Sequence, residues 1–215
     1  MTRGPLLRPE PAGAEFLSLL TPPDWTAVFG SPGALELEIG SGGGAFALGH
    51  AARHPEVRYV AIEWRKKYAR ELEHRARARG LSNLRVVEAD ARAVIPRLFA
   101  PDSLAAIHLQ FPDPWWKRAH QKRAILTTGF ASLLLGLTAP GGVFDLRTDV
   151  RSRAEEMLAT LEASGWHNPL GPGSFHPADP EEVPSSRERR YLLAGEPVYR
   201  ARLIKRSSPC SIPTF

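Results

Sequence analysis

A carboxylate held between two prolines is the residue in this sequence best suited to chemistry. It stands in the stretch Gln110-Phe-Pro-Asp113-Pro-Trp-Trp-Lys117-Arg-Ala-His120-Gln-Lys122-Arg123. Proline locks its own φ angle, so a proline on each side favours one fixed position for Asp113. The aromatic and basic residues that follow suit RNA, because indoles stack on bases and cations hold phosphates. We therefore predict an RNA-contacting surface next to Asp113, formed by Trp116, Arg118, His120, Lys122 and Arg123.

A purely structural interpretation of this stretch is a solvated basic start of a helix, with the two tryptophans packed beneath it. For Arg118 and for Arg123, each taken alone, the structural interpretation and contact with RNA both stay open. For Asp113 between its two prolines, the functional interpretation is favoured.

A second candidate site is the glycine-rich turn Gly40-Ser-Gly-Gly-Gly44, which follows the apolar run Leu35–Ile39. Glycine allows a sharp turn and lets the backbone pass close to a ligand. Acidic residues recur around it, because Glu63 ends the next apolar run and Asp90 follows the third. A carboxylate such as Glu63 can accept hydrogen bonds from both hydroxyls of a ribose, and Asp90 can meet an adenine amino group. The pattern predicts a nucleoside cofactor site that includes Gly40 and Gly42.

Three interpretations of the turn compete. It is a tight strand-to-helix connection that binds nothing, a dinucleotide site, or a site for S-adenosylmethionine. Gly40, Gly42 and Ala45 satisfy the dinucleotide pattern G-x-G-x-x-A. Glu38 favours the third interpretation, since a carboxylate beside the turn repels a pyrophosphate and suits the cationic amino group of S-adenosylmethionine. The turn Ala139-Pro-Gly-Gly142 also resembles the one found in nucleoside-methyltransferase folds.

Hydrophobic periodicity indicates which elements position these residues, because β-rich apolar runs alternate with helical patterns from about residue 34. The expected strands are Ala34–Ile39, Val57–Ile62, Leu84–Val87, Leu104–Leu109 and Val143–Leu146, with late strand signal at Val198–Ile204. The expected helices are Ala45–Arg53, Arg65–Arg79, Ala91–Phe99, Ala124–Leu137 and Arg151–Ser164. This alternation predicts an α/β fold with a mostly parallel sheet and helices on both faces. Sheets of this kind bind ligands at the carboxyl ends of their strands, where Asp113 lies.

The expected domain organisation has three parts. Residues 1–33 carry several prolines and few periodic apolar positions, so we expect a loosely attached N-terminal arm. Residues 34–206 form the catalytic domain, and residues 207–215 form a C-terminal tail. The segment 168–190 is too long for a simple connection in a compact domain, and we expect a substrate loop there.

Composition narrows the function classes. The chain has 215 residues, 43% of them hydrophobic, which excludes a purely disordered protein. No apolar run reaches the roughly 18 residues of a membrane span, and the N-terminus lacks the apolar core of a signal peptide. The net charge of +5 favours a polyanionic partner. The single cysteine, Cys210, forms no internal disulfide and is too isolated for a metal site, so we expect a cytoplasmic protein without a metal. Monomer and homodimer both stay open.

The stretch Phe111-Pro-Asp-Pro-Trp-Trp-Lys-Arg-Ala-His-Gln-Lys-Arg123 resembles the signature of the bacterial tRNA (guanine-N7-)-methyltransferases, which reads Phe-Pro-Asp-Pro-Trp, any residue, Lys and a basic run with His. The resemblance extends from about Leu35 to Leu203 and includes Leu37-Glu-Ile-Gly-Ser-Gly42, Ala61-Ile-Glu63 and Arg147-Thr-Asp149. It implies a Rossmann-like class I methyltransferase fold. It also implies methyl transfer from S-adenosylmethionine to N7 of the variable-loop guanosine (position 46) of tRNA.

The resemblance also implies roles for individual residues. Contacts to S-adenosylmethionine fall on Glu38, Glu63, Asp90 and Asp113, and Asp113 is also the active-site carboxylate. Contacts to the tRNA substrate fall on Lys117, Asp149 and the segment Ser185-Ser186-Arg187-Glu188. That segment aligns with a Thr-Lys-aromatic-Glu motif and keeps only the glutamate, with serine in place of threonine. Ala119 also replaces a usual basic residue.

Guanine N7 carries a lone pair and no proton, so the reaction needs no general base, and positioning supplies the rate. Two other functions fit parts of the sequence. A small-molecule methyltransferase would share the cofactor site, but the basic, tryptophan-bearing stretch argues against it. A non-catalytic RNA-binding module would leave Glu38, Glu63 and Asp113 without a role.

Overall fold

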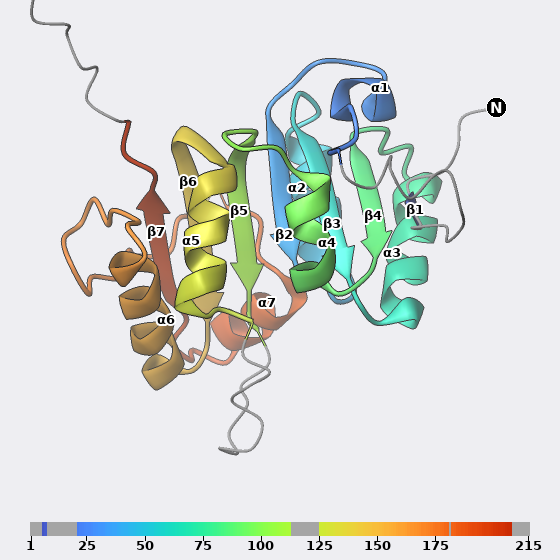
Figure 1. Cartoon of the computed structure of the whole chain (residues 1–215). Coiled ribbons are helices and arrows are strands. Elements are labelled where there is room, and N and C mark those ends of the chain that lie inside the picture. Colours follow the sequence, from blue (N-terminus) through green and yellow to red (C-terminus); the bar gives the residue numbers. More distant parts are fainter. Residues whose placement is uncertain (1–5, 8–20, 113–124, 181, 208–215) are drawn as a thin grey trace, which may run out of the picture.

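The structure, a computed structural model, describes residues 6–7, 21–112, 125–180 and 182–207. Its centre is a seven-stranded sheet in the order β1-β4-β3-β2-β5-β6-β7 (Figure 1). The strands are β1 (Leu6–Leu7), β2 (Leu35–Ile39), β3 (Arg58–Glu63), β4 (Leu84–Glu88), β5 (Leu104–Gln110), β6 (Thr138–Thr148) and β7 (Tyr199–Ile204). All neighbouring pairs are parallel except β6 and β7, which are antiparallel. The expected mostly parallel α/β sheet is confirmed.

Helices cover both faces of the sheet (Figure 1). They are α1 (Trp25–Phe29), α2 (Ala45–Arg53), α3 (Lys66–Ala78), α4 (Ala91–Leu98), α5 (Thr128–Leu137), α6 (Arg151–Ala163) and α7 (Ser186–Leu193). We call the face that packs against α1, α4, α5 and α6 the α5 face, and the face that packs against α2, α3 and α7 the α2 face. Among the described residues, none of the helices combines the length and the apolar composition needed to span a bilayer.

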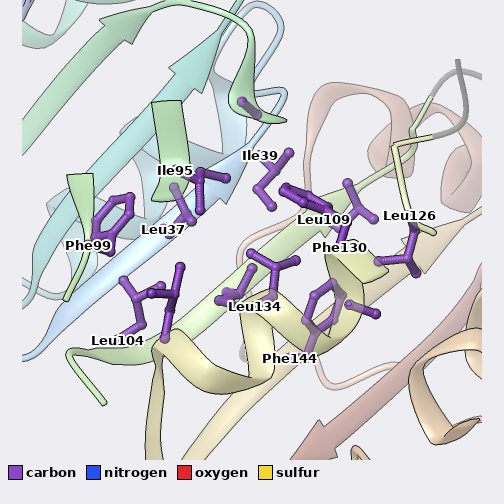
Figure 2. Packing of buried hydrophobic residues seen from close by; sticks show 14 of the residues in the cluster. Leu37, Ile39, Ile95, Phe99, Leu104, Leu109, Leu126, Phe130, Leu134 and Phe144 are labelled. Carbon is purple, nitrogen blue, oxygen red and sulfur yellow. The ribbon is translucent and has the colours of Figure 1, made fainter. Parts of the chain in front are cut away.

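The α5 face holds the larger hydrophobic core. Alternate strand residues such as Leu37, Leu109 and Phe144 point toward α4 and α5 and are almost fully buried, as Figure 2 shows. Leu134 of α5 and Ile95 of α4 fill the space above them. A second cluster on the α2 face joins α2 and α3 to β3 and β4. Burial on both faces explains why these strands read as apolar runs.

The helix boundaries follow local capping. Helix α5 was expected from Ala124 and begins at Thr128, where the Thr127 hydroxyl accepts a hydrogen bond from the backbone N–H of Phe130. Helix α4 begins after Asp90, whose carboxylate accepts from the N–H of Arg92 at 3.0 Å. Strand β6 extends beyond the expected Val143–Leu146 at both ends; Thr138 pairs with Leu104 of β5, and the register shifts between Leu104 and Ala106.

Part of the expected N-terminal arm is packed against the core. The Asp24 side chain caps α1, and the Trp25 ring stacks on Phe99 with centroids 5.5 Å apart. Its indole N–H donates to the carbonyl of Leu98 at 2.8 Å. Helix α1, within the expected arm, therefore contacts the core. One buried aromatic side chain anchors a helix too short to show periodicity. The boundaries at residues 33 and 206 stay predictions.

The expected substrate loop at 168–190 contains the start of a helix that the sequence pattern did not reveal. Helix α7 begins when the Ser185 hydroxyl accepts a hydrogen bond from the N–H of Glu188 at 3.2 Å. Its sequence, Ser-Arg-Glu-Arg-Arg-Tyr-Leu-Leu, has no apolar stripe, and its one buried residue is Glu188. Apolar periodicity cannot find a helix that is held by polar contacts.

We predict that Trp25→Ala lowers the free energy of unfolding by about 3–5 kcal/mol, since it removes a buried indole from the core. Trp64→Ala is the matched control, because the Trp64 side chain is 65% exposed and its loss should change stability by about 0.5 kcal/mol or less. Urea denaturation of both variants checks this. Equal stabilities would mean that α1 is not part of the cooperative unit.

Candidate active site

The glycine turn between β2 and α2 needs glycine for two separate reasons. Gly40, Gly42 and Gly44 have φ angles of +76°, +52° and +70°, which side chains rarely adopt. A Cβ atom on Gly44 would also lie 2.2 Å from Cδ1 of Leu72 in α3. A Cβ atom on Gly40 or Gly42 would meet nothing within 4 Å. The turn is therefore closed against α3 at its end and open to a ligand at its start.

Glu63 connects the end of β3 to this turn. One carboxylate oxygen accepts from the N–H of Gly42 at 2.7 Å, and the other accepts from the N–H of Arg65 at 2.7 Å. The side chain is buried at the edge of the site. Each carboxylate oxygen can accept more than one hydrogen bond, so Glu63 can hold the turn and still accept from a ligand.

Glu38 lies beneath the turn and has few partners for a buried carboxylate. The residue is 1% exposed, and the Tyr59 hydroxyl donates to it at 3.3 Å. Burial raises its pKa to about 7, although His108 and Tyr59 oppose the rise. A cationic ligand group beside Glu38 would favour the charged form and bind to it.

The predicted cofactor residues converge on one cavity of about 710 Å³, which is a size typical of ligand pockets. Glu38, Gly40, Gly42, Glu63 and Asp90 all line it. The cavity lies at the carboxyl ends of β2, β3, β4 and β5, as expected for a parallel sheet. Ser185, Ser186 and Arg187 line its other side, so the cofactor residues and three of the four residues aligned with the last motif share one space.

The Phe-Pro-Asp-Pro-Trp stretch begins at the wall of this cavity. Phe111, at the end of β5, has a φ angle of 48°, and strained residues of this kind cluster at binding sites. Phe111, Pro112 and Ile125 line the cavity. The predicted residues Asp113, Trp116, Lys117, Arg118, His120, Lys122 and Arg123 lie outside the described residues. Pro112 and Ile125, the described residues on either side of this stretch, both line the cavity.

Asp149 lies where β6 passes into α6, and α7 holds it. The Arg187 guanidinium donates to its carboxylate at 3.1 Å, and the Tyr191 hydroxyl donates at 2.5 Å. Burial would raise the pKa of Asp149, but these hydrogen bonds outweigh burial and lower the pKa. Arg187 connects Asp149 to the cavity, whereas Asp149 itself does not line it.

Glu188 points away from the cavity into a buried ion-pair network on the α2 face. One carboxylate oxygen accepts from Nε and Nη2 of Arg200 at 2.9 and 2.7 Å. The other accepts from Nη1 of Arg147 at 3.0 Å, and Nη2 of Arg147 donates to Asp145 at 3.0 Å. These carboxylates raise the pKa of Arg147 against the opposing effect of burial. Glu188 therefore has protein partners for both oxygens, and its contact with guanine stays a prediction.

Sequence reasoning missed Arg147 and Arg200 as functional residues. Both lie at inward positions of their strands, 2% and 5% exposed, and the β6–β7 register pairs them directly. The signal available in the sequence was an arginine at an inward position of each of two apolar strands. Charged residues are rarely buried without partners, so these arginines indicated a buried ion-pair network.

Comparison with known proteins assigns this chain to a family. A family model described as "Putative methyltransferase" matches residues 33–201. A tRNA (guanine-N(7)-)-methyltransferase of Myxococcus xanthus is 67% identical over 94% of this chain and 98% of its own length. One from Anaeromyxobacter dehalogenans is 56% identical over 85% of this chain and 92% of its own. The chain belongs to the tRNA (guanine-N(7)-)-methyltransferase family. The predicted membership is confirmed.

Solved structures support the fold. The 16S rRNA methyltransferase KamB aligns with a TM-score of 0.62 and 19% identity, over 91% of this chain and 95% of its own. A 16S rRNA (adenine(1408)-N(1))-methyltransferase from Catenulisporales acidiphilia, solved with the cosubstrate SAM, aligns with a TM-score of 0.56 and 17% identity, over 88% and 93% of the two chains. The predicted methyltransferase fold is confirmed, and at these identities the likeness concerns the fold alone.

We predict that Glu63→Gln weakens binding of S-adenosylmethionine about 10- to 100-fold, because an amide replaces a carboxylate that holds the N–H of Gly42. Glu88→Gln is the matched control. Glu88 pairs with Glu63 in the β3–β4 register but is not among the residues lining the cavity. Calorimetry should find unchanged affinity for the control. Equal losses in both variants would contradict a specific role for Glu63.

We also predict that Glu188→Gln lowers the free energy of unfolding by about 3–5 kcal/mol, because the buried Arg200 loses its carboxylate partner and Arg147 loses one of its three. Ser186→Ala, at an exposed position of the same helix, should leave stability unchanged. Urea unfolding and methyl transfer are measured for both. A stable Glu188→Gln protein without activity would instead favour direct contact with the substrate.

Proposed function

We propose that this chain transfers a methyl group from S-adenosylmethionine to N7 of the variable-loop guanosine (position 46) of tRNA. The observation that carries the proposal is the 67% identity to a tRNA (guanine-N(7)-)-methyltransferase over nearly the whole chain. The acidic cavity behind the glycine turn supports it independently. Since tRNA is the proposed substrate, we also propose that the protein acts in the cytoplasm.

The residues of the cavity fit S-adenosylmethionine. Burial raises the pKa of the Glu38 carboxyl, and the cationic amino group of the methyl donor would stabilise its charged form. The open space beside Gly40 and Gly42 lets a ligand approach the backbone. Glu63 is proposed to accept from the ribose and Asp90 from the adenine amino group. When bound, S-adenosylmethionine supplies an electrophilic methyl group on a positively charged sulfur.

The chain's own contribution is proposed to be positioning. Guanine N7 has a free lone pair, so no side chain needs to remove a proton. Holding the base and the methyl donor in line provides the effective molarity. Asp113, the residue after a proline at the cavity wall, is proposed to fix the guanine through its edge donors. Its negative charge would also favour the positive charge that arrives on the purine.

The tRNA is proposed to contact the chain on the side of α7. Arg187 lies at the cavity edge and is partly exposed. The family motif has an aromatic residue at this position. Because Arg187 is a cation instead, we propose that its guanidinium contacts a phosphate of the tRNA. Ser185, Ser186 and Asp149 are proposed as further contacts, with Lys117 and the basic stretch that follows it. The net charge of +5 supports binding to a polyanion.

We expect the purified chain to form 7-methylguanosine when it is incubated with unmodified tRNA and labelled S-adenosylmethionine. A matched transcript with adenosine in place of the variable-loop guanosine is the control and should stay unlabelled. Nucleoside analysis of both digests measures the result. Label in another nucleoside, or equal label in both transcripts, would contradict the proposal.

A further inference from the structure

Three side chains outside the active-site cavity bring metal-binding atoms together on the α2 face. Glu36 is on β2, His108 on the neighbouring strand β5, and His50 on α2, which lies above both. The Glu36 oxygen Oε2 lies 2.8 Å from Nε2 of His50 and 2.9 Å from Nε2 of His108. All three atoms lie within 4.8 Å of one another. None of the three residues lines the active-site cavity.

The donor set matches a known class of site. Two imidazoles and one carboxylate, with a further position open, are ligands that Zn²⁺ takes in proteins. Bonds of about 2.0–2.1 Å in a tetrahedral site separate the ligand atoms by about 3.3 Å. The two oxygen-to-nitrogen distances would have to lengthen by about half an ångström, a change that small side-chain rotations can supply.

A second carboxylate stands behind the cluster. Oδ2 of Asp145 lies 3.5 Å from Nδ1 of His108. A carboxylate at the far nitrogen of a metal-binding histidine holds the imidazole in place and directs its other nitrogen toward the ion. Asp145 and His108 are opposite each other in the β5–β6 register, so the sheet fixes this pair.

The cluster borders a network of charged side chains on the α2 face. Its carboxylates are Glu36, Asp145, Glu182 and Glu188, and its buried guanidinium groups are Arg147 and Arg200. Arg202 reaches Glu182 from the solvent side. Oδ1 of Asp145 is buried and has no hydrogen-bond partner among the described residues. The unpartnered oxygen of Asp145 leaves a carboxylate beside His108 whose charge can balance part of the charge of a bound cation.

An ion can reach the cluster from solvent. The Glu36 and His50 side chains are 14% and 15% exposed, whereas His108 is the buried member. A metal site needs such an entry path as well as suitable ligands.

We propose that Glu36, His50 and His108 form a binding site for a divalent transition-metal ion of the zinc type, which fastens α2 to β2 and β5. The sequence-based expectation of no metal rested on the single, isolated cysteine, and this cluster uses no cysteine. The site is separate from the methyl-transfer chemistry, so its test does not depend on the proposed function.

The test is Zn²⁺ binding by the full chain carrying Cys210→Ser, which removes the one thiol. After treatment with a chelator, the protein is dialysed against Zn²⁺, and bound metal is measured by mass spectrometry and by competition with a chromophoric chelator. We expect one Zn²⁺ per chain and an affinity that falls at least about tenfold in His50→Gln. The visible spectrum of bound Co²⁺ should show tetrahedral nitrogen and oxygen ligation.

His54→Gln is the matched control. His54 follows α2, its ring centroid lies 4.6 Å from that of His50, and its side chain is 41% exposed beside Glu56. Its loss should leave zinc affinity unchanged. Glu36→Gln serves as a second variant if His50→Gln does not fold. The absence of retained zinc in the parent protein, or equal affinity in the parent and His50→Gln, would overturn the proposal.

Discussion

The burial of the Glu188 carboxylate is the constraint on which the substrate side of this protein depends. A charge can leave water only when other groups replace its hydration, and here Arg147 and Arg200 donate to both of its oxygens. Helix α7 has no apolar stripe. These ion pairs therefore hold it against the sheet, whereas the other helices are held mainly by apolar packing. The position of α7 then sets where Ser185 and Arg187 stand at the cavity. A polar core contact therefore determines the geometry of a binding surface.

The two faces of the sheet are specialised as a result. The α5 face is mostly apolar and holds the larger of the two hydrophobic clusters. On the α2 face, packing against α2 and α3 changes to a charged network toward β6 and β7. Gly49 of α2 comes so close to the segment before α7 that an added Cβ atom would lie 2.5 Å from a methyl group of Val183. The apolar and charged halves of this face are thus joined by close packing.

Much of this architecture could be predicted from the sequence, because buried parallel strands leave apolar runs and glycine turns leave their own signature. The grouping of Glu38, Glu63 and Asp90 followed from the same reasoning, since parallel strands end at one edge. What failed has a common cause. Helix α7 is polar, α1 has only five residues, and Glu36, His50 and His108 are far apart in sequence. Local periodicity carries no information about which distant polar residues meet.

The antiparallel strand β7 has a consequence for how the protein is made. The strands around the glycine turn, β2 to β5, are complete by residue 110, whereas Glu188 and Arg200 come near the end of the chain. During synthesis the N-terminal part leaves the ribosome first. Strands β2 to β5 can therefore be outside the ribosome while Arg147 still lacks Glu188. Until β7 inserts beside β6, the sheet has an open edge that can pair with other chains. Strand β7 covers the edge of β6, becomes the edge strand itself, and completes the substrate half.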